Sequence, residues 1–242
     1  MARKRKQIKK EIVKKDVRDV KELKKEPVSR KEQVKSQNKI LRNILIVIGI
    51  LMAGIFLFMI VSNSLSRFEY RGVDFEIVRF CDAGPPCLVT YRTSLPVKVL
   101  DNATAVIVSP EEKDADYDFY LRNDPRKLDV NFNGTLRFGN NMVLNSEDAF
   151  TCNGKGAIAA ANLVQLYNVL RTKVINDKNA TCDSLERYIF VVVKSGNETR
   201  IDEFEPSCYN IYINNCEILE GTEKFMIETL VKVNEGLKKQ NN

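Results

Sequence analysis

One uninterrupted apolar run dominates the pattern of hydrophobic and polar positions along the chain. Ile44 to Val61 are 18 consecutive apolar or glycine residues, and the uncharged stretch around them covers 24 residues, from Asn43 to Ser66. In a helix this stretch reaches about 36 Å, enough for a hydrocarbon core of about 30 Å. We therefore predict a single transmembrane helix over 43–66. A cleaved signal sequence, with Ser62 to Ser64 at the cleavage site, is the alternative, although 42 residues precede the stretch.

After the span, alternating apolar and polar residues predict strands. Val73–Phe80 alternates in this way, and the turn Gly84-Pro85-Pro86 joins it to a second strand at 87–93. Tyr188–Lys194 is the most apolar of the expected strands, so we place it at the centre of the sheet. Further strands are expected at 105–108, 117–121, 198–204 and 208–213, and a hairpin at Asn133-Gly134 within 130–138.

Two segments have helical periodicity. In 157–175, one face carries Ala159, Leu163, Leu166, Leu170 and Val174. The second helix begins near Thr222, a good N-cap residue, and its stripe is Met226, Leu230, Val233 and Leu237. Segregated strands and helices indicate an α+β domain over 67–242, with a mainly antiparallel sheet and two helices.

The charge distribution orients the predicted span. Residues 1–43 hold 17 Lys or Arg and 6 Asp or Glu, a net of +11, whereas the remaining 199 residues hold 21 and 26, a net of −5. Because Lys and Arg accumulate on the cytoplasmic side of a membrane helix, we expect a basic cytoplasmic tail over 1–42. The domain at 67–242 would then face the outside of the cell membrane.

The tail itself allows three interpretations. A thin apolar stripe recurs near every 3.6 residues, through Ile8, Ile12, Val13, Val17, Val20 and Leu23. We favour a solvated tail that sets the topology; the alternatives are a surface helix on anionic lipid headgroups and a site for an acidic cytoplasmic partner. Nucleic acid is the least favoured partner, because the tail has no aromatic residue on which bases could stack.

The cysteines agree with an outer domain. All six lie after the span, and an even number in an oxidising compartment indicates three disulfides. Fifteen pairings are possible, and local spacing favours Cys81–Cys87 and Cys208–Cys216, which leaves Cys152–Cys182. Four Asn-X-Thr sequons, at Asn102, Asn133, Asn179 and Asn197, are candidates for glycosylation outside the cell.

The residue types restrict the chemistry. The chain has no His, and its cysteines lack the paired C-x-x-C spacing of zinc sites, so we expect no metal site, no cofactor and no His-based catalysis. The densest polar cluster is Tyr120–Lys127, in which Arg122, Asp124 and Arg126 are a candidate site for an anionic ligand. A simple Asn-Asp-Pro turn, with Asp124 bonded to the local backbone, is the preferred interpretation of the same residues.

Three segments carry a resemblance to known proteins. They are Tyr120–Arg126, Cys182–Val193 and Cys208–Phe225, and they resemble uncharacterised, single-span membrane proteins of small-genome archaea. The resemblance implies a compartment and an architecture, and it brings no activity with it.

The sequence therefore favours a single-pass membrane protein that serves as a cell-surface binding or assembly module with an unknown protein partner. An enzyme is the less favoured class. The alternatives are a membrane-tethered extracytoplasmic enzyme without His, or a scaffold whose basic tail recruits a cytoplasmic partner.

The topology can be tested with protease added to right-side-out vesicles. Because the charge excess precedes the span, the protease should digest residues 67–242 and leave the tail protected. A protected C-terminal domain would overturn the orientation.

Overall fold

Helix α2 (Arg30–Leu65) opens the part of the chain that the computed structural model describes, which is residues 30–82, 84–101 and 104–240. Within it, Leu41–Val61 has a mean hydropathy of 3.2, and none of its residues is buried. These 21 residues extend about 32 Å, so α2 is long and apolar enough to span a bilayer, in agreement with the predicted span. The apolar stripe predicted at residues 8–23 lies outside the described residues. The chain separates into two units, Met1–Val61 and Ser62–Asn242.

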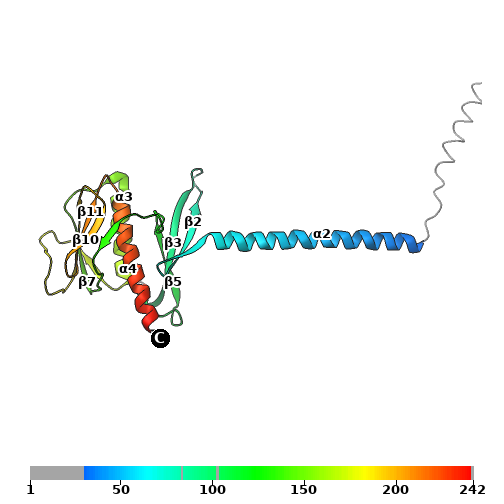
Figure 1. Cartoon of the computed structure of the whole chain (residues 1–242). Coiled ribbons are helices and arrows are strands. Elements are labelled where there is room, and N and C mark those ends of the chain that lie inside the picture. Colours follow the sequence, from blue (N-terminus) through cyan, green and yellow to red (C-terminus); the bar gives the residue numbers. More distant parts are fainter. Residues whose placement is uncertain (1–29, 83, 102–103, 241–242) are drawn as a thin grey trace, which may run out of the picture. The chain divides into compact units, whose positions relative to one another are not determined.

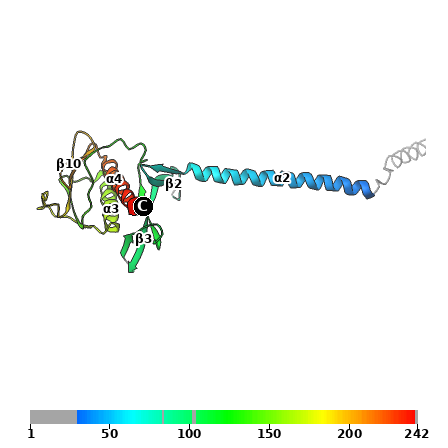
Figure 2. The same cartoon turned by 60° about the horizontal axis from the view of Figure 1, so that its bottom comes forward.

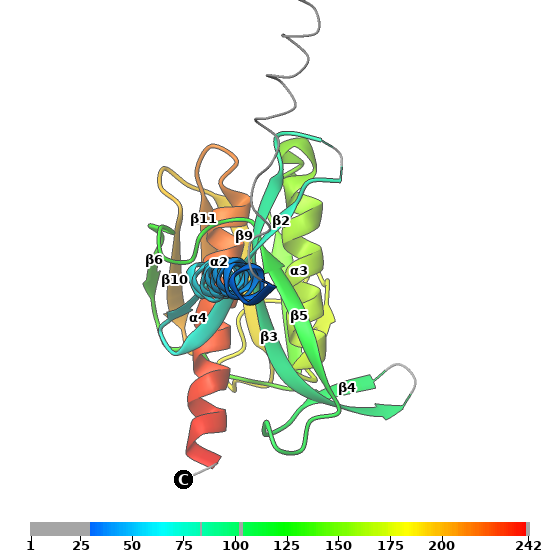
Figure 3. The ribbon, with the colours of Figure 1, turned by 90° about the vertical axis from the view of Figure 1, so that its right-hand side faces the viewer.

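The first sheet of the second unit is antiparallel throughout. It contains β1 (Arg67–Tyr70), β2 (Val73–Phe80), β3 (Leu88–Asp101), β4 (Thr104–Ile107) and β5 (Ala115–Leu121). The long strand β3 pairs with β2 through its first residues and with β4 through its last, while β5 pairs along its opposite edge (Figure 3). The predicted alternation is present in β2, where Val73 and Phe75 are buried and Asp74 is exposed.

The second sheet is mainly parallel. Its strands are β6 (Asn131–Asn133), β7 (Asn141–Ser146), β8 (Lys173–Ile175), β9 (Ile189–Ser195), β10 (Arg200–Glu205) and β11 (Cys208–Ile213), in the order β6-β10-β11-β9-β7-β8. The β10–β11 pair is antiparallel, and the other four pairs are parallel. Over both sheets five of nine strand pairs are antiparallel, so the predicted α+β class is confirmed. The predicted central strand is β9, whose first five residues are all buried.

Two helices fill the space between the sheets. A short 3-10 turn, η1 (Cys152–Gly154), leads into α3 (Lys155–Val169), and α4 (Ile218–Gln240) follows the second sheet. Both helices lie between the sheet of β2, β3 and β5 and the sheet of β7, β10 and β11 (Figures 1 and 2). The loop at 176–188 packs on the other face of the second sheet, where Cys182 and Tyr188 contact Phe190 and Val192.

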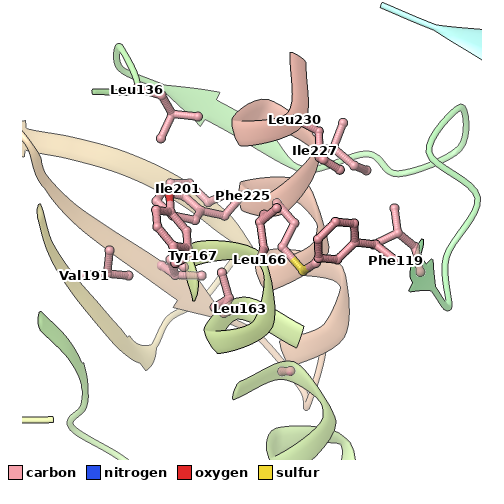
Figure 4. Close-up of a cluster of buried hydrophobic side chains, with 14 of the residues drawn as sticks. Phe119, Leu136, Leu163, Leu166, Tyr167, Val191, Ile201, Phe225, Ile227 and Leu230 are labelled. Carbon is pink, nitrogen blue, oxygen red and sulfur yellow. The ribbon is translucent and has the colours of Figure 1, made fainter. Parts of the chain in front are cut away.

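The core is centred on Phe225 of α4. Its ring centroid lies 5.3 Å from that of Tyr209 in β11, 6.3 Å from that of Tyr167 in α3 and 6.4 Å from that of Phe132 in β6. Figure 4 shows Phe225 beside Tyr167 and Ile201. The close approach of α4 to β11 requires Gly221, because a Cβ there would lie 2.7 Å from Cδ1 of Ile213.

Three local predictions are wrong. The helix predicted to reach Ile175 ends at Val169, because Arg171 adopts a positive φ of 61° and Thr172 to Ile175 leave the helix for β8. The hairpin at Asn133-Gly134 is absent, since β6 pairs in parallel with β10. Thr222 does not cap α4: the helix begins at Ile218, and the Thr222 hydroxyl donates to the Ile218 carbonyl.

The predicted cysteine pairing is right for one bond of three. Cys81–Cys87 forms as expected, but the other two disulfides are Cys152–Cys216 and Cys182–Cys208. Strand β11 explains why Cys208 and Cys216 do not pair. It starts at Cys208 and ends before Cys216, so it separates the two cysteines. An extended strand of six residues covers about 20 Å, whereas bonded cysteines have Cα atoms within about 7 Å.

The disulfides should differ in their effect on stability. In the chain-entropy model, a bond across 64 positions, as in Cys152–Cys216, stabilises by about 4 kcal/mol, against about 2 kcal/mol across the 6 positions of Cys81–Cys87. Replacing both cysteines of each pair by Ser in the full chain should therefore lower the thermal midpoint more for Cys152–Cys216. Equal losses, or a larger loss for Cys81–Cys87, would contradict this ranking.

Candidate functional site

The predicted ligand residues Arg122, Asp124 and Arg126 lie directly after β5. Asp124 is buried, and its carboxylate accepts hydrogen bonds from Nε of Arg126 (2.9 Å), Nη2 of Arg126 (2.7 Å) and the Arg126 backbone N–H (3.1 Å). These bonds lower the pKa of Asp124. The Arg126 guanidinium also lies 3.8 Å from the ring centroid of Phe68. Asp124 and Arg126 thus neutralise each other, within a turn whose geometry matches the preferred interpretation.

A hollow of about 340 Å³ lies beside this turn. Arg122 and Asp124 line it, and Arg126 is not among its lining residues. The lining contains two cationic side chains and four carboxylates: Arg122, Lys127, Asp124, Asp129, Glu217 and Glu220. This balance is unfavourable for an anion, so the geometry gives the anion site no support, and it stays a prediction.

Glu223 of α4 is hydrogen-bonded to the same turn. It is 1% exposed, and its carboxylate accepts hydrogen bonds from the backbone N–H groups of Arg122 (2.6 Å) and Asn123 (2.9 Å) and from the Asn123 side chain (2.9 Å). Burial raises the pKa of Glu223 to about 6, against the lowering effect of these three donors. Glu223 therefore acts as a structural acceptor, which fixes the end of β5 against α4.

The candidate glycosylation sites are only partly described. Asn133, Asn179 and Asn197 are exposed, and Asn102 lies outside the described residues. The Asn133 side chain donates to Oδ1 of Asp202 at 3.0 Å. Exposure is compatible with glycosylation, which stays a prediction.

A second pocket, of about 370 Å³, lies at the carboxyl ends of β7 and β9. The two strands are parallel neighbours, so their carboxyl ends meet at one edge of the sheet. From β7 the chain continues through α3 to β8 on one side, and from β9 it continues to β10 on the other. The two connections leave in opposite directions along the sheet, and the pocket lies between their starting points, which is where open α/β sheets bind ligands, although β10 here is antiparallel to β9. We name this cavity the switch-point pocket.

The wall of the switch-point pocket is mostly apolar. Its lining residues are Leu144, Asn145, Ser146, Asp148, Ala149, Phe150, Thr151, Gly156, Ala159, Ala160, Leu163, Asn176, Val193, Ile218 and Thr222. They come from β7, β9, the first turns of α3 and α4, and the loops after β7 and β8. No sequence motif marks this set, because its members are separated by up to 78 positions in the chain.

The rim of the pocket is held in place by covalent and polar contacts. The Cys152–Cys216 disulfide joins the loop before α3 to the loop before α4. The loop after β7 is bonded to β9, since the Asp148 carboxylate accepts from the Ser195 N–H at 2.9 Å and the Val193 carbonyl accepts from the Glu147 N–H at 3.0 Å. Both loops are therefore fixed before any ligand arrives.

Small residues create the hollow itself. Gly156, Ala159 and Ala160 present little side-chain volume on the first turns of α3. Gly156 admits no side chain, because a Cβ there would lie 1.8 Å from the Phe150 carbonyl oxygen. The run Gly156–Ala161, with four Ala in six residues, is the sequence signal that marks this helix face.

Comparisons of the chain with protein-family models, with curated proteins and with solved structures find no match. The resemblance to single-span archaeal membrane proteins therefore stays a prediction, and the site has to be interpreted from its own geometry.

The raised pKa of Glu223 predicts a pH dependence of stability. The folded-state pKa of about 6 lies above the unfolded value of 4.5, so the protonated form is favoured by folding. This contribution, about 2 kcal/mol, is complete below pH 4.5 and is lost as the pH rises through 6. Relative to Glu223→Gln, the wild type should therefore lose about 2 kcal/mol of unfolding free energy between pH 4.5 and 7.

Urea denaturation of the full chain in lipid nanodiscs, followed by tyrosine fluorescence, measures this difference. Glu111→Gln, a change at an exposed glutamate, serves as the matched control and should run parallel to the wild type. A constant difference between wild type and Glu223→Gln across this pH range would disprove the assignment.

Proposed function

We propose that the chain is a single-pass membrane protein whose C-terminal domain faces the outside of the cell and serves as a binding module. The basic residues before α2 support a cytoplasmic N-terminus. The three disulfides support an oxidising compartment for the domain. A bilayer is thus its first partner, with anionic headgroups as a further partner of the basic tail.

The switch-point pocket is the observation that carries the proposal. It combines an apolar wall, a few polar groups and a volume within the range of small-molecule sites. Its rim is braced by the Cys152–Cys216 disulfide, so binding requires little ordering of the loops. We propose that this pocket takes a small, largely apolar molecule.

The lining favours binding over catalysis. Asp148 is the one acidic or basic side chain among the described residues that line the pocket. The hydroxyls of Ser146 and Thr222 donate to the backbone carbonyls of Asp148 (2.5 Å) and Ile218 (2.6 Å). Among the described lining residues, no second acid or base is present to form a proton-transfer pair with Asp148, and all six cysteines are in disulfides. The first alternative is a membrane-tethered enzyme, and the second is a scaffold for a cytoplasmic partner.

The test fills the pocket from α3. Ala160 is exposed and lines the pocket, and a helical side chain leans toward the N-terminus, so Ala160→Phe would place its ring in the hollow. We expect the affinity for 4-fluorobenzyl alcohol to fall by about tenfold or more, because the ring and the probe compete for one volume. Fluorine NMR of the full chain in phosphatidylcholine nanodiscs measures it.

Ala161→Phe is the matched control. Ala161 is exposed on the same helix and is not a lining residue of the pocket, so its variant should bind like the wild type. Empty nanodiscs correct for probe dissolved in lipid. Equal binding by wild type and Ala160→Phe, or an equal loss in both variants, would refute the proposed site.

A further inference from the structure

A second hollow, of about 500 Å³, lies at the opposite end of α3 from the switch-point pocket. The first turns of α3 and α4 line the switch-point pocket, whereas the last turns of both helices line this hollow, together with β4 and one residue of β3. We name it the basic groove. Val233 is buried and Phe138 is 48% exposed, so its wall runs from the core to the surface. The wall is mostly apolar, through Ile107, Val108, Phe138, Leu170, Val233 and Leu237.

Three cations surround this apolar wall. Lys98 comes from β3, Arg171 from the end of α3 and Lys232 from α4, and no Asp or Glu is present among the described lining residues. The side chains of Lys98 and Arg171 have no hydrogen bond or ion pair with the described part of the chain. Nζ of Lys232 lies 3.8 Å from the carboxylate of Glu235, which is outside the lining. A cleft lined by one sign of charge attracts ligands of the other sign.

The C-terminus of α3 is the feature that opposes an anion in the groove, because a helix dipole is negative at that end, by about half an elementary charge. The backbone N–H groups of Arg171 and Thr172 already donate to the carbonyls of Asn168 (3.0 Å) and Tyr167 (2.8 Å). Three full positive charges outweigh what remains of the dipole. The groove therefore favours an anion.

Arg171 occupies a position where glycine would suit the backbone better. It follows the last residue of the α3 end with a φ of 61°, and its neighbour Thr172 closes the helix by donating to the Tyr167 carbonyl. Glycine is the usual residue there, because a Cβ is crowded in the left-handed region. A cation at a helix C-terminus recovers only part of this cost. The arginine is thus kept against a local preference.

Gly236 is the second residue of the groove that its element does not require. It lies within α4, and a Cβ there would meet no atom within 4 Å. Glycine destabilises a helix relative to alanine, so packing does not explain its presence. The missing side chain leaves the groove open. Residues that break local preferences gather at functional sites, and here two of them line one cavity.

We infer that the basic groove binds an amphipathic anion, which is a single acyl chain with a carboxylate head. The chain packs against Phe138, Leu170 and Leu237, and the carboxylate lies among the three cations. A volume of about 500 Å³ has room for one chain, whereas a phospholipid carries two. The inference goes beyond the proposed function and does not depend on the switch-point pocket.

Two probes of one shape test the inference. They are 8,8,8-trifluorooctanoate, an anion at pH 7, and the neutral alcohol 8,8,8-trifluorooctan-1-ol. We expect the acid to bind about fivefold more tightly than the alcohol, as for an exposed ion pair at the upper end of its range. Fluorine NMR of the full chain in zwitterionic nanodiscs gives both dissociation constants, and empty nanodiscs correct for probe dissolved in lipid.

Two double variants separate local contact from the general charge of the domain. Lys98→Gln with Arg171→Gly removes two cations of the groove, and the glycine also relieves the left-handed position, so the fold should persist. Lys173→Gln with Lys178→Gln removes two exposed cations that do not line the groove. The preference for the acid should disappear in the first double variant and persist in the second.

Gly236→Leu tests the volume of the groove. The side chain would fill the open space beside Gly236, so we expect the affinity for the acid to fall by about tenfold or more. Leucine is a better helix former than glycine, so the thermal midpoint, followed by circular dichroism, should not fall. This variant therefore separates loss of the site from loss of the fold.

Three outcomes would overturn the inference. The first is an acid that binds no more tightly than the alcohol. The second is an acid preference that both double variants lose equally. The third is acid binding that is the same in wild type and in folded Gly236→Leu. None of these results bears on the switch-point pocket, whose own test is the Ala160→Phe variant.

Discussion

The fold depends on one helix that is buried on nearly every side. From Ile218 to Val233, α4 has no exposed residue, because the helix lies between the two sheets. A helix in this position needs apolar residues all round, and its polar ones need partners within the domain. Thr222 and Thr229 meet this need by donating to carbonyls one turn earlier in α4.

Three further polar side chains of α4 connect it to the first sheet. Glu223 accepts from the backbone after β5, Glu228 pairs with Arg71 in the β1–β2 turn, and Asn234 donates to the Gly72 carbonyl. Apolar packing alone would let a sheet slide over a helix, since it is not directional. These bonds fix the register of the first sheet on α4, and Glu228 has a second partner in Lys224, whose Nζ lies 3.1 Å from the same carboxylate oxygen.

Local patterns predicted the elements, and long-range pairing decided their arrangement. The alternation in Val73–Phe80 and the apolar run at Tyr188–Lys194 were sufficient to predict β2 and the central strand β9. The parallel second sheet could not be predicted in this way, because its pairs join strands through crossovers and leave no mark on neighbouring residues. The segment Asn141–Ser146 is too short and too mixed in polarity to be predicted as strand β7. Val174 fits the apolar stripe of the predicted helix, although it lies in β8.

The disulfide error has the same physical origin. Sequence spacing measures loop length, whereas bonding depends on where strands carry the cysteines. Because β11 is extended, its two flanking cysteines are carried to opposite ends of the sheet and each bonds a loop at its own end. The candidate site shows the limit most clearly. Arg122 and Asp124 are two positions apart and could be proposed together from the sequence, whereas the switch-point pocket is assembled from four distant elements.

The pocket also follows from the choice of small residues on α3. Ala is the best helix former, so Ala159 and Ala160 stabilise the helix while they leave space beside Phe150 and Val193. Larger apolar side chains at these positions would fill that space and gain the dispersion energy that the hollow forgoes. The Cys152–Cys216 bond keeps the surrounding loops from collapsing into it. A cavity that is both opened by small residues and braced against closure is what a pre-formed binding site requires, because the ligand then recovers packing that the empty fold lacks.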